Sequence, residues 1–257
     1  MTKKMNYLMM TALILFGATA ISFAQDDSSY EMWESIMLTP DNTKLKVLGE
    51  NMRKHNQKYH VKGGAHEAAV YNITSGPNSG KLIWEMGPIT FSDLDTRPAE
   101  GGHDEDWRDN VMPYVKKLGS VEYWKIMKDL SNTEMLDEDN SKYPILYFRY
   151  FEVTKDHGYT IPHLLKQMSD AVKAMDSENP WGLYDNQLRQ GLDIGRHIAW
   201  VSFLKNWAEF DIDGNFKDAF LEVNGKDSWD AYLRGMDDTF SNSWDEIWVY
   251  NKELSGH

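Results

Sequence analysis

The sequence contains no cysteine, and this absence excludes several kinds of chemistry. Without a thiol the chain can form no disulfide bond, thiolate metal site or iron–sulfur cluster, and it has no cysteine nucleophile. Basic residues are also scarce, because 27 Lys and Arg face 40 Asp and Glu, which gives a formal net charge of −13. Since nucleic-acid binding depends on clustered Lys and Arg, we expect no nucleic-acid partner.

The sequence also lacks the short motifs that identify common enzyme classes. It has no phosphate-binding glycine-rich loop, no dinucleotide fingerprint, no Gly-x-Ser-x-Gly elbow and no zinc signature. What the 257 residues do contain is a large aromatic complement of 10 Trp, 13 Tyr and 10 Phe. With 41% hydrophobic and 26% charged residues, the composition is that of an ordinary globular protein.

Residues 1–24 have the pattern of a secretory signal peptide. Lys3 and Lys4 give a positive start, residues 8–21 form an apolar run, and residues 22–24 offer small side chains at the expected cleavage site. The run is shorter than the roughly 20 residues that span a bilayer, and polar residues follow it directly. We therefore expect export to the periplasm or the cell exterior, with no membrane span after the signal is removed.

Three pairs of tryptophans recur in the same order along the chain. The pairs are Trp84 and Trp200, Trp107 and Trp229, and Trp124 and Trp248. Around the last pair, residues 124–131 and 248–255 share Trp, Lys, an acid, Leu and Ser in register, at a separation of 124. One such match could arise by chance, but three matches in the same order and at similar separations predict an internal duplication.

The expected secondary structure also repeats. The patterns of the first half predict a strand over 30–38, a helix over 40–59, strands over 68–73 and 81–91, a helix over 104–117 and a strand over 122–130. Those of the second half predict a strand over 143–154, a helix over 161–175, strands over 181–188 and 197–210, helix over 216–240 with a break, and a strand over 244–253. We therefore expect a first unit over 25–136, a linker over 137–142 and a second unit over 143–257.

Two successive β-α-β-β-α-β units resemble a ferredoxin-like duplication. They are similar to the dimeric α+β barrel superfamily, which includes proteins like the antibiotic-biosynthesis monooxygenases. The resemblance implies an α+β fold, in which two tandem ferredoxin-like βαββαβ units form an intramolecular pseudo-dimeric α+β barrel. It also implies a choice of activities, among them cofactor-free monooxygenation of aromatic or quinone-like compounds, haem binding and haem degradation.

The space between the two sheets is the candidate ligand site, because apolar walls with a few polar groups are typical of small-molecule pockets. Strand alternation and the two-half correspondence select these candidates: Trp33, Ser35, Trp84, Tyr150, Glu152, His197, Trp200 and Ser202. The same residues could instead form a packed inter-sheet core. No residue set identifies catalytic residues.

The functional hypotheses follow from this site. The first is an exported protein that binds a small hydrophobic or aromatic molecule between the sheets. The second is a cofactor-free monooxygenase-like oxidoreductase, or a haem-binding protein, that uses the same pocket. The third is an interaction protein whose exposed aromatic side chains meet another exported chain.

The histidines are the remaining candidates for chemistry. His55, His60 and His66 lie close together in sequence, and His55 and Tyr59 share a helix face, so a haem or metal site could use them. However, His55 falls on the apolar stripe of its helix, which is more typical of a packed core histidine. His103 precedes three acids that look like an acidic helix start. We therefore expect no metal site and no required cofactor, with haem as the lesser alternative.

Overall fold

The computed structural model describes residues 30–97, 101–136, 140–154, 157–176, 178–188, 197–212 and 214–256. The predicted signal peptide over 1–24 lies outside the described residues. So do the middle of the predicted linker, at 137–139, and the loop over 189–196.

The order of elements is β-α-β-β-α-β in each half, as the sequence predicted. The strands are β1 (Met32–Pro40), β2 (Ala68–Ser75), β3 (Leu82–Ile89), β4 (Val115–Ile126), β5 (Ile145–Val153), β6 (Trp181–Asn186), β7 (Ile198–Leu204) and β8 (Phe240–Tyr250). The helices are α1 (Leu45–Tyr59), α2 (His103–Asp106), α3 (Ile161–Lys173), α4 (Phe216–Asn224), α5 (Trp229–Thr239) and α6 (Lys252–Ser255).

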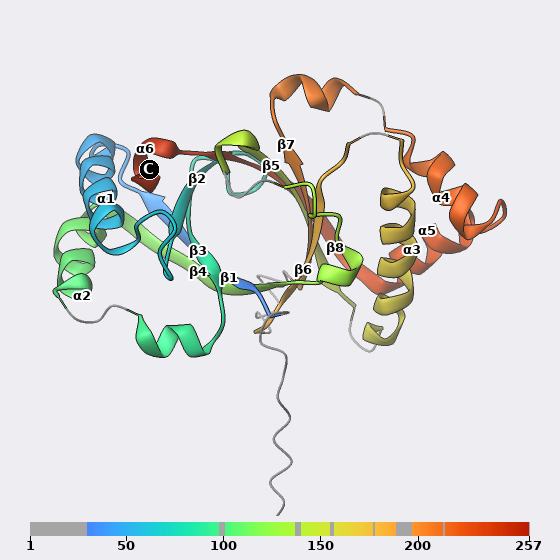
Figure 1. Ribbon diagram of the computed structural model, residues 1–257, viewed down its shortest axis with the longest axis horizontal. Coiled ribbons are helices and arrows are strands. Elements are labelled where there is room, and N and C mark those ends of the chain that lie inside the picture. Colours follow the sequence, from blue (N-terminus) through green and yellow to red (C-terminus); the bar gives the residue numbers. More distant parts are fainter. Residues whose placement is uncertain are drawn as a thin grey trace, which may run out of the picture.

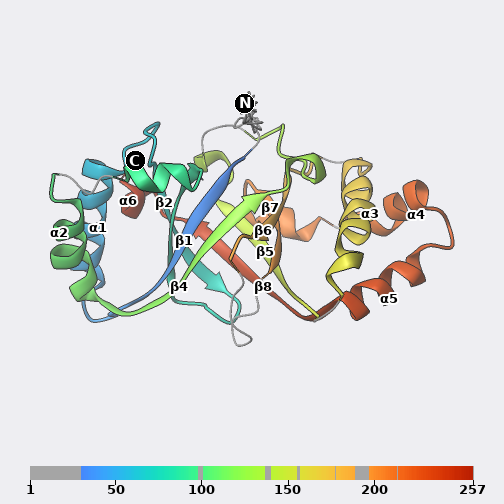
Figure 2. The ribbon, with the colours of Figure 1, turned by 90° about the horizontal axis from the view of Figure 1, so that it is seen from below.

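The eight strands form one closed barrel in the order β1-β3-β2-β8-β5-β7-β6-β4. Each half supplies four adjacent strands, and the antiparallel pairs β2–β8 and β4–β6 join the halves. The helices lie outside the barrel on opposite sides (Figures 1 and 2). The intramolecular pseudo-dimeric barrel expected from the duplication is therefore confirmed.

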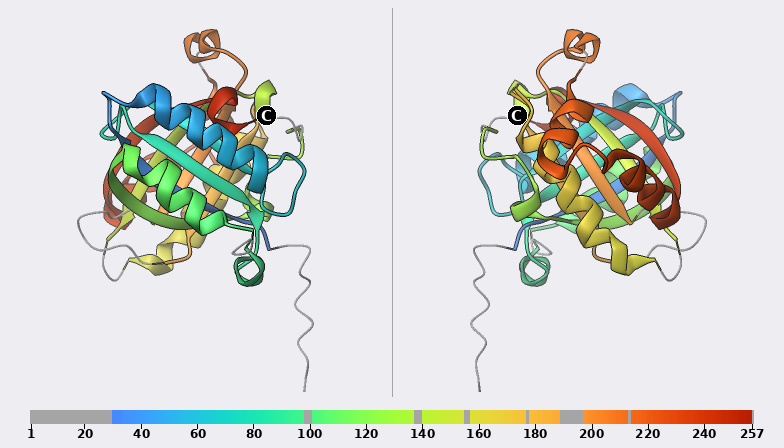
Figure 3. Two further views of the ribbon diagram at one scale, coloured as in Figure 1. Left: turned by 90° about the vertical axis from the view of Figure 1, so that its left-hand side faces the viewer. Right: turned by 90° about the vertical axis from the view of Figure 1, so that its right-hand side faces the viewer.

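Helices α1 and α2 cover the outer face of the first half, and α3, α4 and α5 cover that of the second (Figure 3). The C-terminal α6 crosses back to the first half, where the carbonyl of Leu254 accepts a 2.8 Å hydrogen bond from the Asn56 amide of α1. Ser255 accepts a 2.8 Å bond from the backbone N–H of Val70 in β2. None of the helices in the described ranges has the length and apolarity needed to cross a membrane.

Both faces of the sheet are buried, because helices cover the outside and the strands face one another across the inside. Alternation along β3 shows this: Ile83 joins the core inside the barrel, while Trp84 joins the core beneath α1. The equivalent outer core of the second half lies beneath α3 and includes Met168 and Phe220. The aromatic content of the chain is thus divided among three cores.

Several predicted element boundaries were wrong. The helix expected over 104–117 ends earlier, since a π-helical stretch and a 3-10 turn follow α2 and the strand β4 begins at Val115. The strand expected over 197–210 stops at Leu204, and the aromatic residues beyond it form the 3-10 segment Trp207–Asp211. The last strand begins at Phe240 and not at 244. In the first and last cases strand pairing overrides the local pattern, whereas β7 ends where its partner strand β5 begins.

Candidate ligand-binding site

A cavity of about 350 Å³ lies inside the barrel. Its wall includes the aromatic residues Trp33, Tyr71, Trp124, Tyr184 and Trp248, together with the polar residues Ser35 and Glu85. Smaller apolar side chains of the inner face, such as Ala69 and Val201, leave the space that the rings do not fill. The inter-sheet space is therefore partly open, and its wall combines aromatic surface with a few polar groups, as small-molecule pockets do.

Ser35 and Glu85 form the polar part of this wall. They are register partners on β1 and β3, and the Ser35 hydroxyl donates a 2.9 Å hydrogen bond to Oε1 of Glu85. Burial raises the pKa of Glu85 to about 7, although the Ser35 hydrogen bond acts in the opposite direction. Near neutral pH this carboxyl group can therefore either donate or accept a proton.

The two aromatic hydroxyls that line the cavity belong to Tyr71 and Tyr184. Burial raises the pKa of each phenol, and the nearby charge of Glu85 raises it further. Both tyrosines are therefore neutral hydrogen-bonding groups at physiological pH.

The second half of the chain has apolar residues where the first half has this polar pair. In the first half, Ser35 of β1 pairs with Glu85 and Glu122. In the second half, Phe148 of β5 pairs in the same way with Val201 and Glu246. Ser35 and Phe148 therefore occupy equivalent positions. The equivalent of Ser35–Glu85 is therefore Phe148–Val201, and all four residues line the cavity. One wall of the cavity is polar and the equivalent wall is apolar.

The structure distributes the predicted site residues over different places. Trp33 and Ser35 line the barrel cavity as expected. Tyr150 lies on the same inner face, but it is 1% exposed and packs against Phe148, with ring centroids 5.4 Å apart. Glu152 pairs with Asn242 at the end of β5 and is not among the residues that line the cavity.

Trp84 and Trp200 do not face the inter-sheet space, so their predicted placement was wrong. Trp84 points outward, where its indole N–H donates a 2.9 Å hydrogen bond to the side-chain oxygen of Asn56 in α1. Trp200 and Ser202 also point outward and line a second cavity of about 540 Å³ beneath α3. Because aromatic residues occupy both faces of these strands, alternation alone did not show which face is the inner one.

Arg149 and His197 have structural contacts in the second half. In the second cavity, Arg149 donates two hydrogen bonds to the Asp245 carboxylate, at 2.6 and 2.8 Å, and its guanidinium lies 5.1 Å from the Trp200 ring centroid. The Nδ1 atom of His197 accepts a 3.0 Å bond from the backbone N–H of Val153. His197 therefore connects the start of β7 to the end of β5 through this hydrogen bond, and it lines neither cavity.

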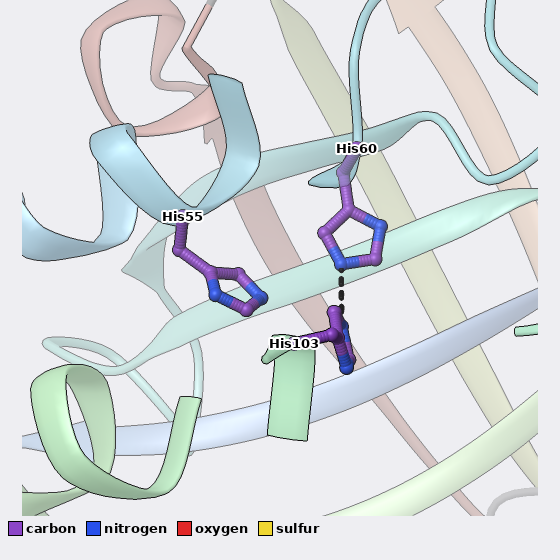
Figure 4. Close-up of side chains that lie close together, drawn as sticks. All are labelled: His55, His60 and His103. Carbon is purple, nitrogen blue, oxygen red and sulfur yellow. Dashed lines mark hydrogen bonds between the residues drawn. The ribbon is translucent and has the colours of Figure 1, made fainter. Parts of the chain in front are cut away.

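A cluster of three histidines lies beneath α1, on the outer face of the first half (Figure 4). His55, His60 and His103 are all buried, and their ligand atoms lie within 4.8 Å of one another. Burial lowers the pKa of His60 to about 3 and also lowers that of His55, so both imidazoles are neutral. The sequence linked His55 to His60, but it gave no sign that His103, in a distant segment, completes the group.

Comparison with other proteins supports the assignment of the fold. No protein-family model matches the chain, and no curated protein matches its sequence. Among solved structures, a candidate monooxygenase from Fusobacterium nucleatum aligns with a TM-score of 0.53 at 6% identity, covering 86% of this chain and 93% of the other. A chlorite dismutase variant from Candidatus Nitrospira defluvii aligns at 0.52 and 11% identity, covering 88% and 93%. The fold is that of the dimeric α+β barrels.

An anthrone oxidase-like protein also shares this dimeric α+β barrel fold, with a TM-score of 0.50, 11% identity and coverage of 86% and 91%. At such low identities the likeness concerns the fold, and the activities belong to those proteins. The function of this dimeric α+β barrel depends on its own side chains.

Proposed function

We propose that the protein binds a small, largely aromatic molecule with one polar group inside the barrel. The observation that carries this proposal is the hydrogen-bonded Ser35–Glu85 pair in a cavity whose other lining residues are mainly aromatic and aliphatic. Aromatic walls offer stacking surface, and one fixed polar pair sets the orientation of the ligand. Because the equivalent wall at Phe148 and Val201 is apolar, the polar end of the ligand is directed to the first half.

The charges around the cavity narrow the ligand class. Glu31 and Glu67 line the cavity along with Glu85, and the chain carries a net charge of −13. Anionic ligands are therefore disfavoured. A neutral phenol or quinol fits better, because its hydroxyl can donate to the Glu85 carboxylate or accept from the protonated form.

Glu85 also supports the enzymatic alternative, a cofactor-free monooxygenase-like oxidoreductase. A carboxyl with a pKa of about 7 is suited to remove a proton from a bound phenol or quinol. The resulting anion is electron-rich, which is the state that a reaction with oxygen requires. Oxygen uptake with a panel of quinols, abolished by Glu85→Gln, would support this activity; no uptake with any quinol would leave the binding function alone.

The wall of the barrel cavity does not fit haem. Haem iron is commonly held by His, Met, Cys or Tyr. No His or Met lines this cavity in the described residues, and the raised pKa values of Tyr71 and Tyr184 oppose the phenolate that would bind iron.

A fluorescent probe tests the binding proposal directly. N-phenyl-1-naphthylamine is neutral, aromatic and has one N–H donor, and the cavity tryptophans can report its arrival. We expect saturable binding that Val201→Phe weakens at least about tenfold by filling the cavity. The matched control is Ser202→Phe, one residue along β7, which fills the second cavity instead. Equal affinity in the two variants would contradict the proposal.

We also propose that the protein is exported, on the basis of the N-terminal sequence pattern. Expression of the full chain in a bacterium, followed by mass spectrometry of the periplasmic fraction, should find a mature protein that begins at Gln25. A cytosolic product that retains Met1 would overturn this proposal.

A further inference from the structure

The three buried histidines beneath α1 lie apart from the barrel cavity, and the proposed function does not use them. His55 lies near the end of α1, His60 directly follows that helix, and His103 begins α2. Their ring centroids are 4.9 to 5.3 Å apart in all three pairs. The rings thus form a compact triangle whose corners come from two separate segments of the chain.

Hydrogen bonds at Nδ1 fix the tautomer of each ring. The Nδ1 atom of His60 lies 2.8 Å from the carbonyl oxygen of His66, which can only accept, so this nitrogen carries the proton. The Nδ1 atoms of His55 and His103 lie 2.8 and 2.7 Å from the carboxylates of Asp106 and Asp104. In a neutral imidazole with its proton on Nδ1, the Nε2 atom has a lone pair and no hydrogen.

When all three rings are neutral, the Nε2 atoms therefore face one another as acceptors. Those of His60 and His103 lie 3.1 Å apart, and two lone pairs at this distance repel unless a cation or an extra proton lies between them. The Nε2 atom of His55 is buried and has no hydrogen-bond partner. Buried polar atoms are rarely left unpaired, so the Nε2 atom of His55 is expected to have a binding partner.

The second half shows that packing alone does not require histidine here. The separation of 116 residues that relates Trp84 to Trp200 also relates the buried pair Met52 and Met168. At the same separation, His55 corresponds to Ala171, which is fully buried in α3. The equivalent helix therefore packs on its sheet with a methyl group at this position.

The surroundings of the triad are suited to holding an ion in place. Trp84 and Trp107 enclose the triad, with ring centroids 4.8 Å from His60 and 5.1 Å from His55. Asp106 is itself held by a 2.7 Å hydrogen bond from the Asn110 amide. Carboxylates that accept from the far nitrogen of a ligating histidine orient the ring and strengthen it as a ligand.

We propose that His55, His60 and His103 form a three-histidine site for a divalent transition-metal ion, with Zn²⁺ as the expected occupant. Zn–N bonds of about 2.0–2.1 Å in a tetrahedral site place the nitrogens roughly 3.3–3.4 Å apart, close to the 3.1 Å between His60 and His103. An inward movement of His55, whose ligand atom lies within 4.8 Å of the other two, completes the set. The ion fastens the end of α1 to the irregular segment that begins at His103, and water takes the fourth position.

Metal titration of the full chain tests this proposal. Protein treated with a chelator and then dialysed is titrated with ZnCl₂ by calorimetry and with CoCl₂ by visible absorption. We expect one equivalent of either metal, the intense visible bands of tetrahedral Co²⁺, and a rise in thermal midpoint of at least about 5 °C in saturating Zn²⁺. All these readouts are independent of ligand binding in the barrel.

Three variants test which side chains bind the metal ion. His60→Gln and His55→Ala should each weaken Zn²⁺ binding at least about 100-fold, and Asp106→Ala about 10–100-fold. His55→Ala introduces the residue that α3 carries at the equivalent position, so it keeps the protein measurable if His60→Gln does not fold. The matched control is His163→Gln, an exposed histidine of α3, which should leave the affinity unchanged.

Two results would overturn the proposal. One is the absence of stoichiometric binding, or an equal affinity in His55→Ala and His163→Gln. The other is an NMR spectrum in which His103 is doubly protonated and keeps its second proton when Zn²⁺ is added, because a proton shared with His60 would then be the occupant.

Discussion

Trp124 and Trp248 make the same contact in the two halves of the barrel. Each indole N–H donates a 3.0 Å hydrogen bond to the glutamate two residues earlier, Glu122 in β4 and Glu246 in β8. Both glutamates are almost completely buried, at 2% and 0% exposure. The duplication therefore preserved a buried polar contact as well as the order of elements.

Replacement of Glu246 by alanine should strongly destabilise the protein. Its carboxylate accepts from Trp248 and also, at 2.6 Å, from the Asn78 amide, so the change leaves the buried Trp248 indole N–H and the half-buried Asn78 amide without this acceptor. We expect the free energy of unfolding to fall by about 2–4 kcal/mol in urea titrations. Glu222→Ala, on the exposed face of α4, is the control and should change it by less than about 0.5 kcal/mol. Equal effects would refute this role for Glu246.

The raised pKa of Glu85 predicts how stability depends on pH. The folded-state pKa of about 7 lies above the ordinary value of 4.5, so between these values the folded state binds more protons than the unfolded state. The free energy of unfolding should therefore decrease as pH rises from about 4.5 to 7 and then level off. The total decrease from this group is about 3 kcal/mol.

Two substitutions isolate this contribution. Glu85→Gln should remove it from the pH profile measured by urea unfolding. Ser35→Ala should shift the decrease in the free energy of unfolding to higher pH, because the serine hydrogen bond favours the charged carboxylate. A wild-type profile identical to that of Glu85→Gln would show that Glu85 titrates normally.

Gly87 allows Trp33 to pack against the backbone of β3. A Cβ atom at this position would lie 2.5 Å from Cδ1 of Trp33 and 2.9 Å from the carbonyl oxygen of Met32. Gly87→Ala should therefore displace the Trp33 ring, lower stability by about 1–3 kcal/mol and weaken probe binding in the cavity. Gly158→Ala, where a Cβ meets nothing within 4 Å, is the matched control. Unchanged binding and stability in Gly87→Ala would argue against this tight contact.

The ion pair between Arg97 and Glu34 should matter more than the exposed pairs. Glu34 is 2% exposed, and its other carboxylate oxygen accepts a 2.9 Å hydrogen bond from the Tyr123 hydroxyl. Arg97→Ala leaves a buried carboxylate without its cation, and we expect a loss of about 2–4 kcal/mol in thermal or urea unfolding. Arg108→Ala breaks an exposed pair with Asp109 and should cost less than about 1 kcal/mol.

The sequence predicted the element order well because duplication leaves a signal that local patterns lack. Trp107 and Trp229 both begin a helical segment, and the aromatic residues after β3 and β7 both lead into 3-10 turns. Boundaries were less predictable. Lys116 and Lys117 fall within the helix expected over 104–117, but they lie in the exposed first part of β4, where pairing with β1 decides the conformation.

The candidate site was predicted only in part, for reasons of geometry. Period-two alternation identifies two faces of a strand, but here both faces are buried, so Trp33 was placed correctly while Trp84 was assigned to the wrong side. Glu85 was missed because a charged residue between apolar neighbours normally indicates a solvated position. The histidine triad was missed because only tertiary structure brings His103 to His60.

The closure of the barrel within one chain has a consequence for what its cavity can recognise. A barrel assembled from two identical chains repeats every side chain across its twofold axis. An acid at the position of Glu85 would then occur on both walls of the cavity. A fused pair of halves escapes this constraint, since a substitution in one half is not copied into the other. Here one half holds a carboxyl group and the other Val201 at the same place, which allows recognition of a molecule whose two ends differ.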